Sequence, residues 1–415
     1  MFSASRRSAR LSQICVPKIG IQTGPFGSQL HSSDYVSDGT PIITVENLGE
    51  NRIDARSVPM VSPEDAERLS RYRLEPGDIV FSRVGSVDRR ALVRVGEDGW
   101  LFSGRCLRVR PNPSMVDPEF LSYFFGLNGF KEHVRAIAVG ATMPSINTEI
   151  LSNLEILLPP LPEQRAIAEV LGALDDKIES NMRLMMLGAS LIQAEFDSLG
   201  SSSDSWTCLR DLISSPRGAV QTGPFGSNLH ASDYAEHGIP LLLVKHISNG
   251  SVRHEDLPLV SFEKARELES YKLCLHDIVI TRVGRVGDAA LIGTAEVGWL
   301  FSGQMLRIKV EACGLDPFWL ASWFLSPAFK DVINGYAVGS TRQSLSTGIL
   351  LEVPMPKVTI ESQHQFRKVV EPIQSMIWSS RTESTKLSCL RDSLLSELLS
   401  GRLRASEAID LMESS

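Results

Sequence analysis

Hydrophobic and polar positions along the first 160 residues follow the pattern of short strands and short helices. Apolar runs such as PIITVEN, DIVFSRV and CLRVRP are separated by glycine and proline, which is typical of strands joined by turns. The stretch PEFLSYFFGL has the spacing of a short helix. This mixture predicts a compact α+β domain.

Residues 161–199 follow a different pattern, with apolar side chains at steps of three and four and glycine only at Gly172 and Gly188. The spacing predicts one long helix, which at about 1.5 Å per residue would be roughly 58 Å long. A long helix with one narrow apolar stripe needs a second helix to pack against. The alternative is that it is an ordinary core helix of a larger bundle.

The second half of the chain repeats the first half at an offset of 199 residues. The segment QTGPFGSQLHSSDY (22–35) recurs as QTGPFGSNLHASDY (221–234), with twelve of fourteen positions identical. The same offset relates GDIVFSRVG (77–85) to HDIVITRVG (276–284), GWLFSG (99–104) to GWLFSG (298–303), and AVGAT (138–142) to AVGST (337–341). Similarity that keeps one phase over the whole chain indicates tandem duplication of one folded unit.

The duplication predicts a second long helix after the second domain, in which Pro372 should introduce a kink or mark a late start. The expected order is a domain at 1–160, a helix at 161–200, a domain at 201–358, a helix at 359–404 and a tail at 405–415. We expect the two helices to pack antiparallel and to hold the domains apart. Duplex DNA suits such a molecule, because equivalent groove faces recur about every 34 Å.

Composition and charge narrow the classes of function. The 415 residues carry a net charge of −7, which disfavours a broad basic surface but allows a local DNA-binding face. The six cysteines are scattered, which predicts neither a zinc site nor disulfides. No apolar run long enough for a transmembrane helix exists, and no apolar signal core follows the first residues, so we expect a cytoplasmic protein. No methyltransferase, nucleotide-binding or hydrolase motif is present, and no histidine spacing suits a metal.

The segment LEILLPPLPEQRAIAEVLGALDDKIE (154–179) strongly resembles the entry into the first long helix of specificity (S) subunits of type I restriction-modification systems. The G-D-I-V-x-[ST]-R-V-G and A-V-G-x-T segments resemble the target recognition domains of that family. The second junction, LEVPMPKVTIESQHQFRKVV (351–370), departs from the pattern, since Ser362 and Gln363 stand where the first has Glu163 and Gln164. We therefore expect the two helices to dock on partners unequally.

The resemblance implies an α+β fold with two tandem α/β target recognition domains, separated by two long antiparallel, coiled-coil-like helices in a pseudo-twofold internal repeat. It implies a chain without catalytic activity that binds double-stranded DNA, each domain reading one half of a bipartite target. The family binds two methyltransferase (M) subunits and can recruit two restriction (R) subunits. S-adenosylmethionine belongs to the M subunits, which methylate adenine, so no cofactor is expected in this chain.

The repeated QTGPFGS loop offers the first candidates for DNA binding. Its side chains could donate to a phosphate, which singles out Gln22, Ser28, Gln221 and Ser227. The alternative is a structural turn with Phe26 and Phe225 in the core, because a base-reading surface should differ between two half-sites.

The turns SRVGS (82–86) and TRVGR (281–285) place an arginine at the end of a strand, and Arg83 and Arg282 are candidates for phosphate contacts. An ion pair with a neighbouring carboxylate is the alternative. The turn differs between the copies, which makes its other residues candidates for half-site discrimination: Ser86, Arg89, Arg90 and Arg285.

Two further segments occupy equivalent places but share little sequence. In residues 44–56 Asn47 suits adenine, while in residues 243–255 Lys245, His246 and Arg253 suit guanine or phosphate. In the segment after the A-V-G-x-T string, Arg342 and Gln343 replace Met143 and Pro144. Drift of surface loops is the alternative explanation of these differences.

Residues of the two helices are the candidates for helix packing and partner docking: Glu163, Gln164, Ile167, Leu171, Leu174, Ile178, Phe366, Val370, Ile373 and Ile377. The predicted function is DNA sequence recognition without catalysis. A structural adaptor that holds two protein ligands apart, an enzyme such as a nuclease with an unrecognised site, and an orphan regulatory S subunit remain alternatives.

Overall fold

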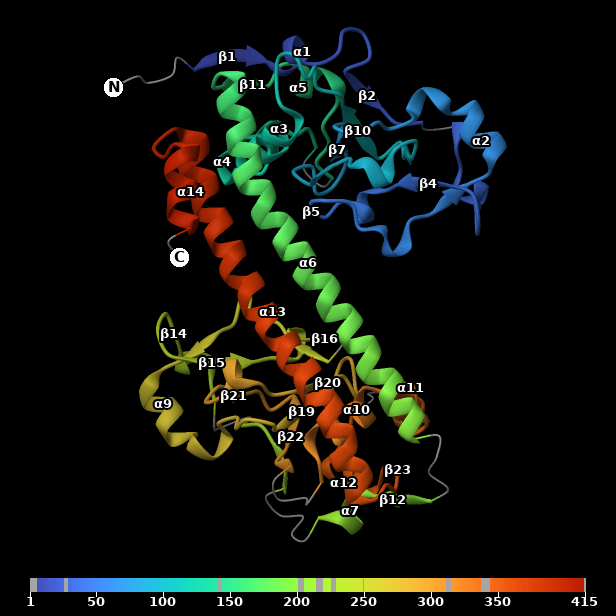
Figure 1. Cartoon of the computed structure of the whole chain (residues 1–415), viewed down its shortest axis with the longest axis vertical. Helices are drawn as coiled ribbons and strands as arrows, with labels where there is room; N and C mark the ends of the chain where they lie inside the picture. Colours follow the sequence, from blue (N-terminus) through green and yellow to red (C-terminus); the bar gives the residue numbers. More distant parts are fainter. Residues whose placement is uncertain are drawn as a thin grey trace. The chain divides into compact units, whose positions relative to one another are not determined.

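A computed structural model of the chain describes residues 6–25, 29–140, 143–200, 205–213, 219–224, 229–248, 250–310, 315–336 and 344–413. It divides into two compact units, which are Met1–Ile178 with Lys386–Ser415, and Glu179–Thr385 (Figure 1). Each unit therefore contains one of the two similar domains and parts of both long helices.

The first domain is built around a five-stranded sheet of order β2-β10-β7-β8-β5. Neighbouring strands of this sheet are antiparallel, except that β5 runs parallel to β8. The central strands are buried on both faces, which explains why their sequence is an apolar run rather than an alternation. The strands are β2 (Ile21–Thr23), β5 (Glu50–Asn51), β7 (Ile79–Ser82), β8 (Arg90–Leu92) and β10 (Cys106–Val109).

Two smaller sheets and several helices complete the first domain. One sheet has the order β3-β6-β4-β9, and the other pairs β1 with β11. The strands are β1 (Arg7–Arg10), β3 (Tyr35–Val36), β4 (Thr40–Ile43), β6 (Met60–Val61), β9 (Leu101–Phe102) and β11 (Glu155–Leu158). The helices are α1 (Leu11–Ile14), α2 (Pro63–Arg68), α3 (Pro118–Phe124), α4 (Asn128–Ile137) and α5 (Thr148–Ser152).

The second domain repeats this topology, except that its central sheet has four strands and a separate pair, β16-β17, lies where the first domain has β5. Its sheets have the orders β13-β22-β19-β20, β14-β18-β15-β21, β12-β23 and β16-β17. The strands are β12 (Trp206–Cys208), β13 (Val220–Thr222), β14 (Tyr234–Ala235), β15 (Ile239–Leu242), β16 (Ile247–Ser248), β17 (Ser251–Val252), β18 (Leu259–Val260), β19 (Ile278–Thr281), β20 (Ala289–Leu291), β21 (Leu300–Phe301), β22 (Met305–Ile308) and β23 (Pro354–Pro356). The helices are α7 (Leu209–Leu212), α9 (Phe262–Glu267), α10 (Pro317–Leu325), α11 (Pro327–Tyr336) and α12 (Thr347–Glu352).

Two long helices follow the domains, α6 (Leu161–Gly200) and α13 (Ile360–Ser400), and a short helix, α14 (Ala405–Glu413), follows α13. Of the two effects expected of Pro372, a kink or a late start, the late start is wrong, since Pro372 lies inside α13. Pro372 is exposed, so water can reach the carbonyl group that loses its helical hydrogen bond at a proline.

The two long helices are antiparallel within each unit. In the first unit Asp175 of α6 contacts Arg391 of α13. In the second unit Asn181 donates to Glu383 at 2.8 Å, and Gly188 lies against Ile377. As residue numbers rise along α6, the numbers of the contacting residues on α13 fall, so the two helices run in opposite directions.

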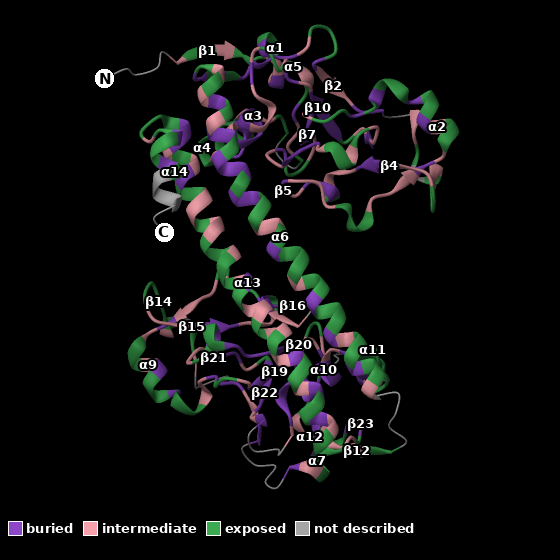
Figure 2. Ribbon diagram, viewed as in Figure 1, coloured by how far each residue is buried: buried purple, intermediate pink, exposed green. Residues whose placement is uncertain are grey.

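The long helices also pack on the domains. Figure 2 shows buried and exposed residues alternating along both helices. Leu171 and Leu174 of α6 belong to the core of the first domain, together with Leu394 and Leu398 of α13. The expectation that the apolar stripe serves only the helix pair is therefore too narrow, because the same stripe closes the core of each domain.

Candidate nucleic-acid interface

Three of the repeated strings, and the segment that follows the A-V-G-x-T string, meet at one edge of the central sheet in each domain. The end of β2, the end of β7 and the start of β10 share this edge because neighbouring strands are antiparallel. The loop before α5 joins them. We call this edge the rim, and define it as residues 23–25, 82–86, 103–106 and 143–146 in the first domain and 222–224, 281–285, 302–305 and 344–345 in the second.

Backbone hydrogen bonds hold the rim in the same way in both domains. In the first domain they run from Gly24 N to Cys106 O (3.2 Å), Arg83 N to Arg105 O (2.8 Å) and Ile146 N to Arg83 O (2.9 Å). In the second they run from Gly223 N to Met305 O (3.2 Å), Arg282 N to Gln304 O (3.0 Å) and Leu345 N to Arg282 O (2.8 Å). The duplicated strings therefore build one backbone frame twice.

The glycine of the QTGPFGS loop is required by a close backbone approach. A Cβ atom on Gly24 would lie 2.2 Å from the carbonyl oxygen of Ser103, and one on Gly223 would lie 2.2 Å from that of Ser302. Only glycine permits this contact. For the glycine, the alternative that this loop is a structural turn therefore explains the repeated sequence.

The polar residues of the same loop do not all face outward. Gln221 is half-buried, and its Oε1 accepts a hydrogen bond from the buried Arg307, so its expected role as a phosphate ligand, which needs its amide nitrogen as donor, remains a prediction. Gln22 is half-buried on β2, opposite Arg108 in the ladder, and remains a prediction. The candidates Ser28, Ser227, Arg342 and Gln343, and the two loop phenylalanines, lie outside the described residues.

Asn47 and His246 do not read bases, which corrects the sequence-based prediction. Each is 2% exposed, and the two residues occupy the equivalent position in the two domains. Asn47 Oδ1 accepts from Thr44 N at 2.9 Å, and His246 Nδ1 accepts from Leu243 N at 3.1 Å. Burial, with a smaller contribution from the positive Lys245, lowers the pKa of His246, which keeps its ring neutral and able to accept.

Arg90 is also inside the protein, and the prediction that it faces DNA is wrong. It is 2% exposed, its Nη1 pairs with Glu50 at 2.8 Å, and its Nε donates to Ser122 O at 2.8 Å.

Arg89 and Arg285 come from non-equivalent positions but bind equivalent carbonyl groups. Arg89 donates to Leu48 O, and Arg285 donates to Ile247 O at 2.6 Å. Both guanidinium groups therefore tie the turn to the preceding segment. The two arginines remain predicted DNA contacts, although part of their hydrogen-bonding capacity is used within the chain.

The remaining candidates are accessible. Ser86 and Lys245 are exposed, and Arg253 is exposed and lies 3.5 Å from Glu255. Arg83 is half-buried, and its Nη1 donates to Gly104 O at 3.2 Å; its contact with a phosphate remains a prediction. Among the described residues, the buried Nε of Arg282 has no acceptor. The rim brings Arg83 and Ser86 together, whereas Lys245 and Arg253 lie on a separate segment.

The start of each long helix is fastened to its domain by a glutamine. Gln164 Oε1 accepts from Asp117 N at 2.9 Å, and its Nε2 donates to Pro159 O at 2.8 Å. The equivalent Gln363 Oε1 accepts from Asp316 N at 2.8 Å. The structure therefore assigns Gln164 to helix packing rather than to partner docking, while Glu163 is half-buried and remains a docking candidate.

The apolar helix candidates are packing residues. Buried in the domain cores are Ile167, Leu171, Leu174, Phe366, Val370 and Ile377, whereas Ile178 and Ile373 are half-buried. A different apolar face of α6 is open: Leu184, Leu187 and Leu191 are 40%, 63% and 59% exposed. We call these three residues the leucine stripe. The leucine stripe was not among the sequence-based candidates, because those candidates followed only the apolar positions with regular core spacing.

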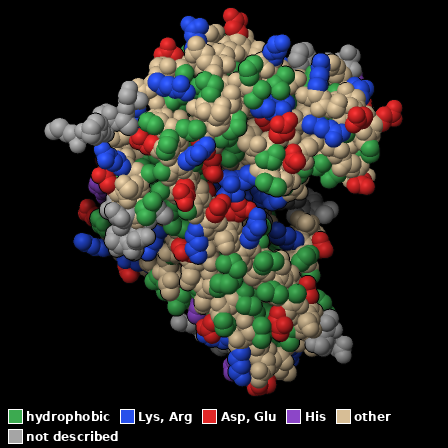
Figure 3. All heavy atoms as spheres, turned by 45° about the horizontal axis from the view of Figure 1, so that its top comes forward, with side chains coloured by type: hydrophobic (Ala, Val, Ile, Leu, Met, Phe, Trp, Pro, Cys, Tyr) green, Lys and Arg blue, Asp and Glu red, His purple; other side chains and the backbone are tan. Residues whose placement is uncertain are grey.

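The charges on the surface are mixed. Figure 3 shows acidic and basic side chains interspersed on the face turned to the viewer, rather than one continuous basic area. In the described parts of the chain, no group of three or more histidine, cysteine, aspartate or glutamate residues could hold a metal ion. No described helix is long and apolar enough to cross a membrane.

Residues 26–184 match the family model described as the type I restriction modification DNA specificity domain. The EcoBI specificity subunit of a type I restriction enzyme from Escherichia coli is 22% identical over 95% of this chain and 86% of its own length. The MjaVIII specificity subunit from Methanocaldococcus jannaschii is 20% identical over 75% of this chain and 76% of its own. The chain is therefore similar to specificity subunits of type I restriction enzymes over most of its length.

A solved structure has a similar fold. The crystal structure of the type I restriction-modification S subunit from M. genitalium superposes with a TM-score of 0.64, at 16% identity, over 96% of this chain and 97% of that chain. At this identity the likeness concerns the fold alone. The predicted fold class, two tandem α+β domains with two long helices, is confirmed.

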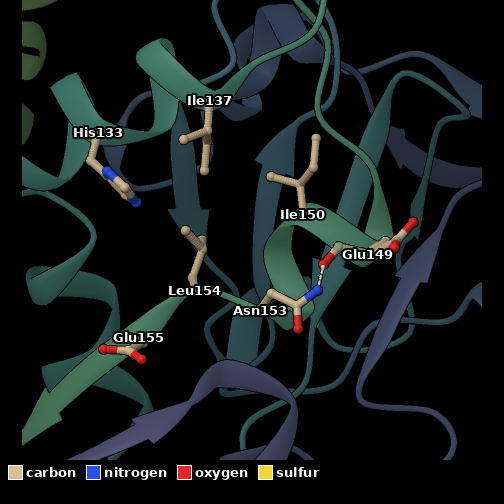
Figure 4. A pocket seen from close by; sticks show the side chains of 7 residues that line it. All are labelled: His133, Ile137, Glu149, Ile150, Asn153, Leu154 and Glu155. Carbon is tan, nitrogen blue, oxygen red and sulfur yellow. Dashed lines mark hydrogen bonds between the residues drawn. The ribbon is translucent and has the colours of Figure 1, made fainter.

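An open groove of about 590 Å³ lies between α4, α5 and β11 in the first domain. Figure 4 shows Ile137, Ile150 and Leu154 pointing toward one another across it, with Glu155 at its side. Its other lining residues are His133, Glu149 and Asn153. The second domain has Val332, Gly348 and Pro354 at the positions of His133, Glu149 and Glu155, so the polar lining is not repeated.

Two exposed residues of the rim were not among the sequence-based candidates. Arg105 and Gln304 occupy the tip of the turn that follows GWLFSG in each domain. The two GWLFSG strings are identical, and the residue directly after each string differs between the copies. That difference is the sequence signal that could have identified these two positions.

Proposed function

We propose that this chain is the non-catalytic DNA sequence-recognition subunit of a type I restriction-modification complex. Each domain reads one half of a bipartite target, and the long helices set the gap between the halves and bind the methyltransferase subunits. Similarity to known specificity subunits supports the first part of this proposal, which is DNA recognition without catalysis. The rim carries the second, because one backbone frame built twice presents different side chains at equivalent places.

The rim has the same backbone but different side chains in the two domains, which supports recognition of a different half-site by each domain. The backbone hydrogen bonds are equivalent in the two domains, whereas Ser86 is replaced by Arg285 and Arg105 by Gln304. Phosphate contacts position a protein on DNA and base contacts specify the sequence. A constant frame with variable tips suits both requirements.

The leucine stripe supports docking of a protein partner on α6. Its three side chains recur at steps of three and four, so they share one face of the helix. An exposed apolar stripe of this kind is typical of a helix that packs against another protein. We propose that it contacts a methyltransferase subunit, which in turn carries S-adenosylmethionine; two such subunits and up to two restriction subunits complete the complex.

The adaptor alternative receives less support. Two domains that hold two similar protein ligands should repeat a ligand-binding groove. The groove between α4 and α5 keeps its acidic residues, Glu149 and Glu155, only in the first domain.

Methylation mapping tests the proposal. Adenine methylation is mapped across the genome in cells that express the cognate methyltransferase subunit with and without this chain. We expect a bipartite motif with an unspecified gap that appears only when the chain is present. A stable complex that methylates nothing would support the orphan regulator instead, and absence of a complex would return the adaptor to consideration.

A further inference from the structure

The turn after GWLFSG has the same backbone in both domains. Cys106 N donates to Ser103 O at 2.9 Å, and Met305 N donates to Ser302 O at 3.0 Å. Each turn is also tied to the neighbouring strand, through Ser103 N to Ile43 O at 2.8 Å and Ser302 N to Leu242 O at 2.9 Å. The residues on both sides of the turns, Phe102, Cys106, Phe301 and Met305, are fully buried.

The tip of this fixed turn carries a long, exposed side chain that differs between the domains. It is Arg105 in the first domain and Gln304 in the second. The carbonyl group of Arg105 accepts from Arg83 N, and that of Gln304 accepts from Arg282 N, so both tips belong to the rim. Within the described part of the chain, neither side-chain head has a hydrogen-bond or ion-pair partner.

The other rim and turn arginines of the first domain are used internally. Arg83 donates to Gly104 O, Arg89 donates to Leu48 O, and Arg90 is buried against Glu50. Arg105 instead projects a free guanidinium from a rigid base. A rigidly held, unpaired hydrogen-bonding group is what recognition of an external ligand requires.

The exchange of arginine for glutamine distinguishes a base contact from a phosphate contact. Glutamine can donate to a phosphate, but it lacks the positive charge that makes arginine a strong phosphate ligand, so a position kept for phosphate binding should keep its charge. Both side chains can make two hydrogen bonds to one base: arginine to O6 and N7 of guanine, and glutamine to N6 and N7 of adenine. The substitution therefore keeps paired hydrogen bonding and changes the base that satisfies it.

We propose that Arg105 and Gln304 are equivalent base-reading residues, of which Arg105 reads a guanine in one half-site and Gln304 an adenine in the other. This assignment rests on the proposed function and adds the position that determines one base of each half-site. It requires that both tips enter the major groove when the domains bind DNA.

The reciprocal substitutions R105Q and Q304R test the assignment in the full chain with its methyltransferase subunit. Methylated motifs are mapped in cells for each variant. R105Q should change one position of one half-site from guanine to adenine, by about tenfold or more in preference, and leave the other half-site unchanged. Q304R should make the opposite change in the other half-site.

Matched controls separate the possible outcomes. R266Q changes an exposed arginine on α9 outside the rim and should leave the motif unchanged. An unchanged motif in R105Q, or equal weakening at all sequences with a smaller dependence on salt, would overturn base reading by Arg105. Co-purification with the methyltransferase subunit confirms folding of each variant. If the unaltered chain directs no motif at all, the proposed function fails rather than this assignment.

Discussion

Arg391 on α13 and Asp175 on α6 form an ion pair in which Arg391 Nη1 lies 2.8 Å from Asp175 Oδ1. Tyr123 of the first domain donates to the other carboxylate oxygen at 2.7 Å. The side chains of Asp175 and Arg391 are only 6% and 18% exposed. One buried carboxylate therefore joins both long helices to the first domain.

Removal of one partner from this network should destabilise the first unit. R391A leaves the Asp175 carboxylate buried without its cation, and we expect a loss of about 2–4 kcal/mol in the free energy of unfolding. R402A breaks an exposed pair with Glu397 and should cost far less, because solvent screens the attraction between the two charges. Urea unfolding of the two variants measures the difference. Equal effects would show that the buried network does not fix the helix pair.

His246 should make stability depend on pH. Its pKa is held below the ordinary value of about 6.5, mainly by burial. As the pH falls below that value, the unfolded chain binds a proton that the folded chain does not, so stability falls between the ordinary and the lowered pKa. H246N supplies the acceptor that Asn47 provides in the first domain, and it should remove this part of the loss of stability.

Unfolding free energies of the wild-type chain and H246N at about pH 7.5 and pH 5.5 test this prediction. The difference between the two proteins should grow as the pH falls, because the other titrating groups are common to both. H246N should also leave the methylated motif unchanged. A changed motif would restore His246 as a base-reading residue, and parallel pH profiles would contradict its buried neutral state.

The rim should not tolerate a side chain at the glycine of the repeated loop. In G24A or G223A the new methyl group would lie 2.2 Å from a carbonyl oxygen of the facing turn. We expect about 1–3 kcal/mol of destabilisation, as for other overpacked sites, and weaker methylation. G96A is the matched control, since a Cβ there meets no atom within 4 Å. Thermal unfolding compares the variants, and similar values for G24A and G96A would refute the close approach.

The leucine stripe should contribute to the methyltransferase complex but not to the fold of this chain. Replacement of Leu184, Leu187 and Leu191 by glutamine removes exposed apolar surface without disturbing the core. We expect at least about tenfold weaker binding of the methyltransferase subunit and unchanged unfolding of the chain. V95Q changes an exposed apolar residue away from α6 and serves as the control. Unaltered affinity of the triple variant would exclude the stripe as the contact.

The duplicated frame could be predicted from the sequence because identical strings at one offset require the same backbone. The roles of particular side chains could not. Asn47 and His246 differ in type, which suggested different bases, yet both accept a backbone hydrogen bond at the same buried place. Their burial depends on residues distant in sequence. Gln164 and Gln363 likewise show their function only when Asp117 and Asp316 are in place.

The position of Arg105 illustrates the opposite case. Its difference from Gln304 is visible when the two repeats are aligned, but only the structure shows that both side chains are exposed and start from the same backbone. A difference between two side chains indicates different binding when both start from the same backbone position. The same difference indicates little when the conformation of the segment is unknown.

Exchange of one domain tests the central claim most directly. Residues 1–160 are replaced by the equivalent domain of another specificity subunit, and methylated sites are mapped in cells that contain the cognate methyltransferase subunit. The account predicts that one half of the bipartite motif changes while the other half stays the same. A motif that changes in both halves, or in neither, would contradict the reading of one half-site by each domain.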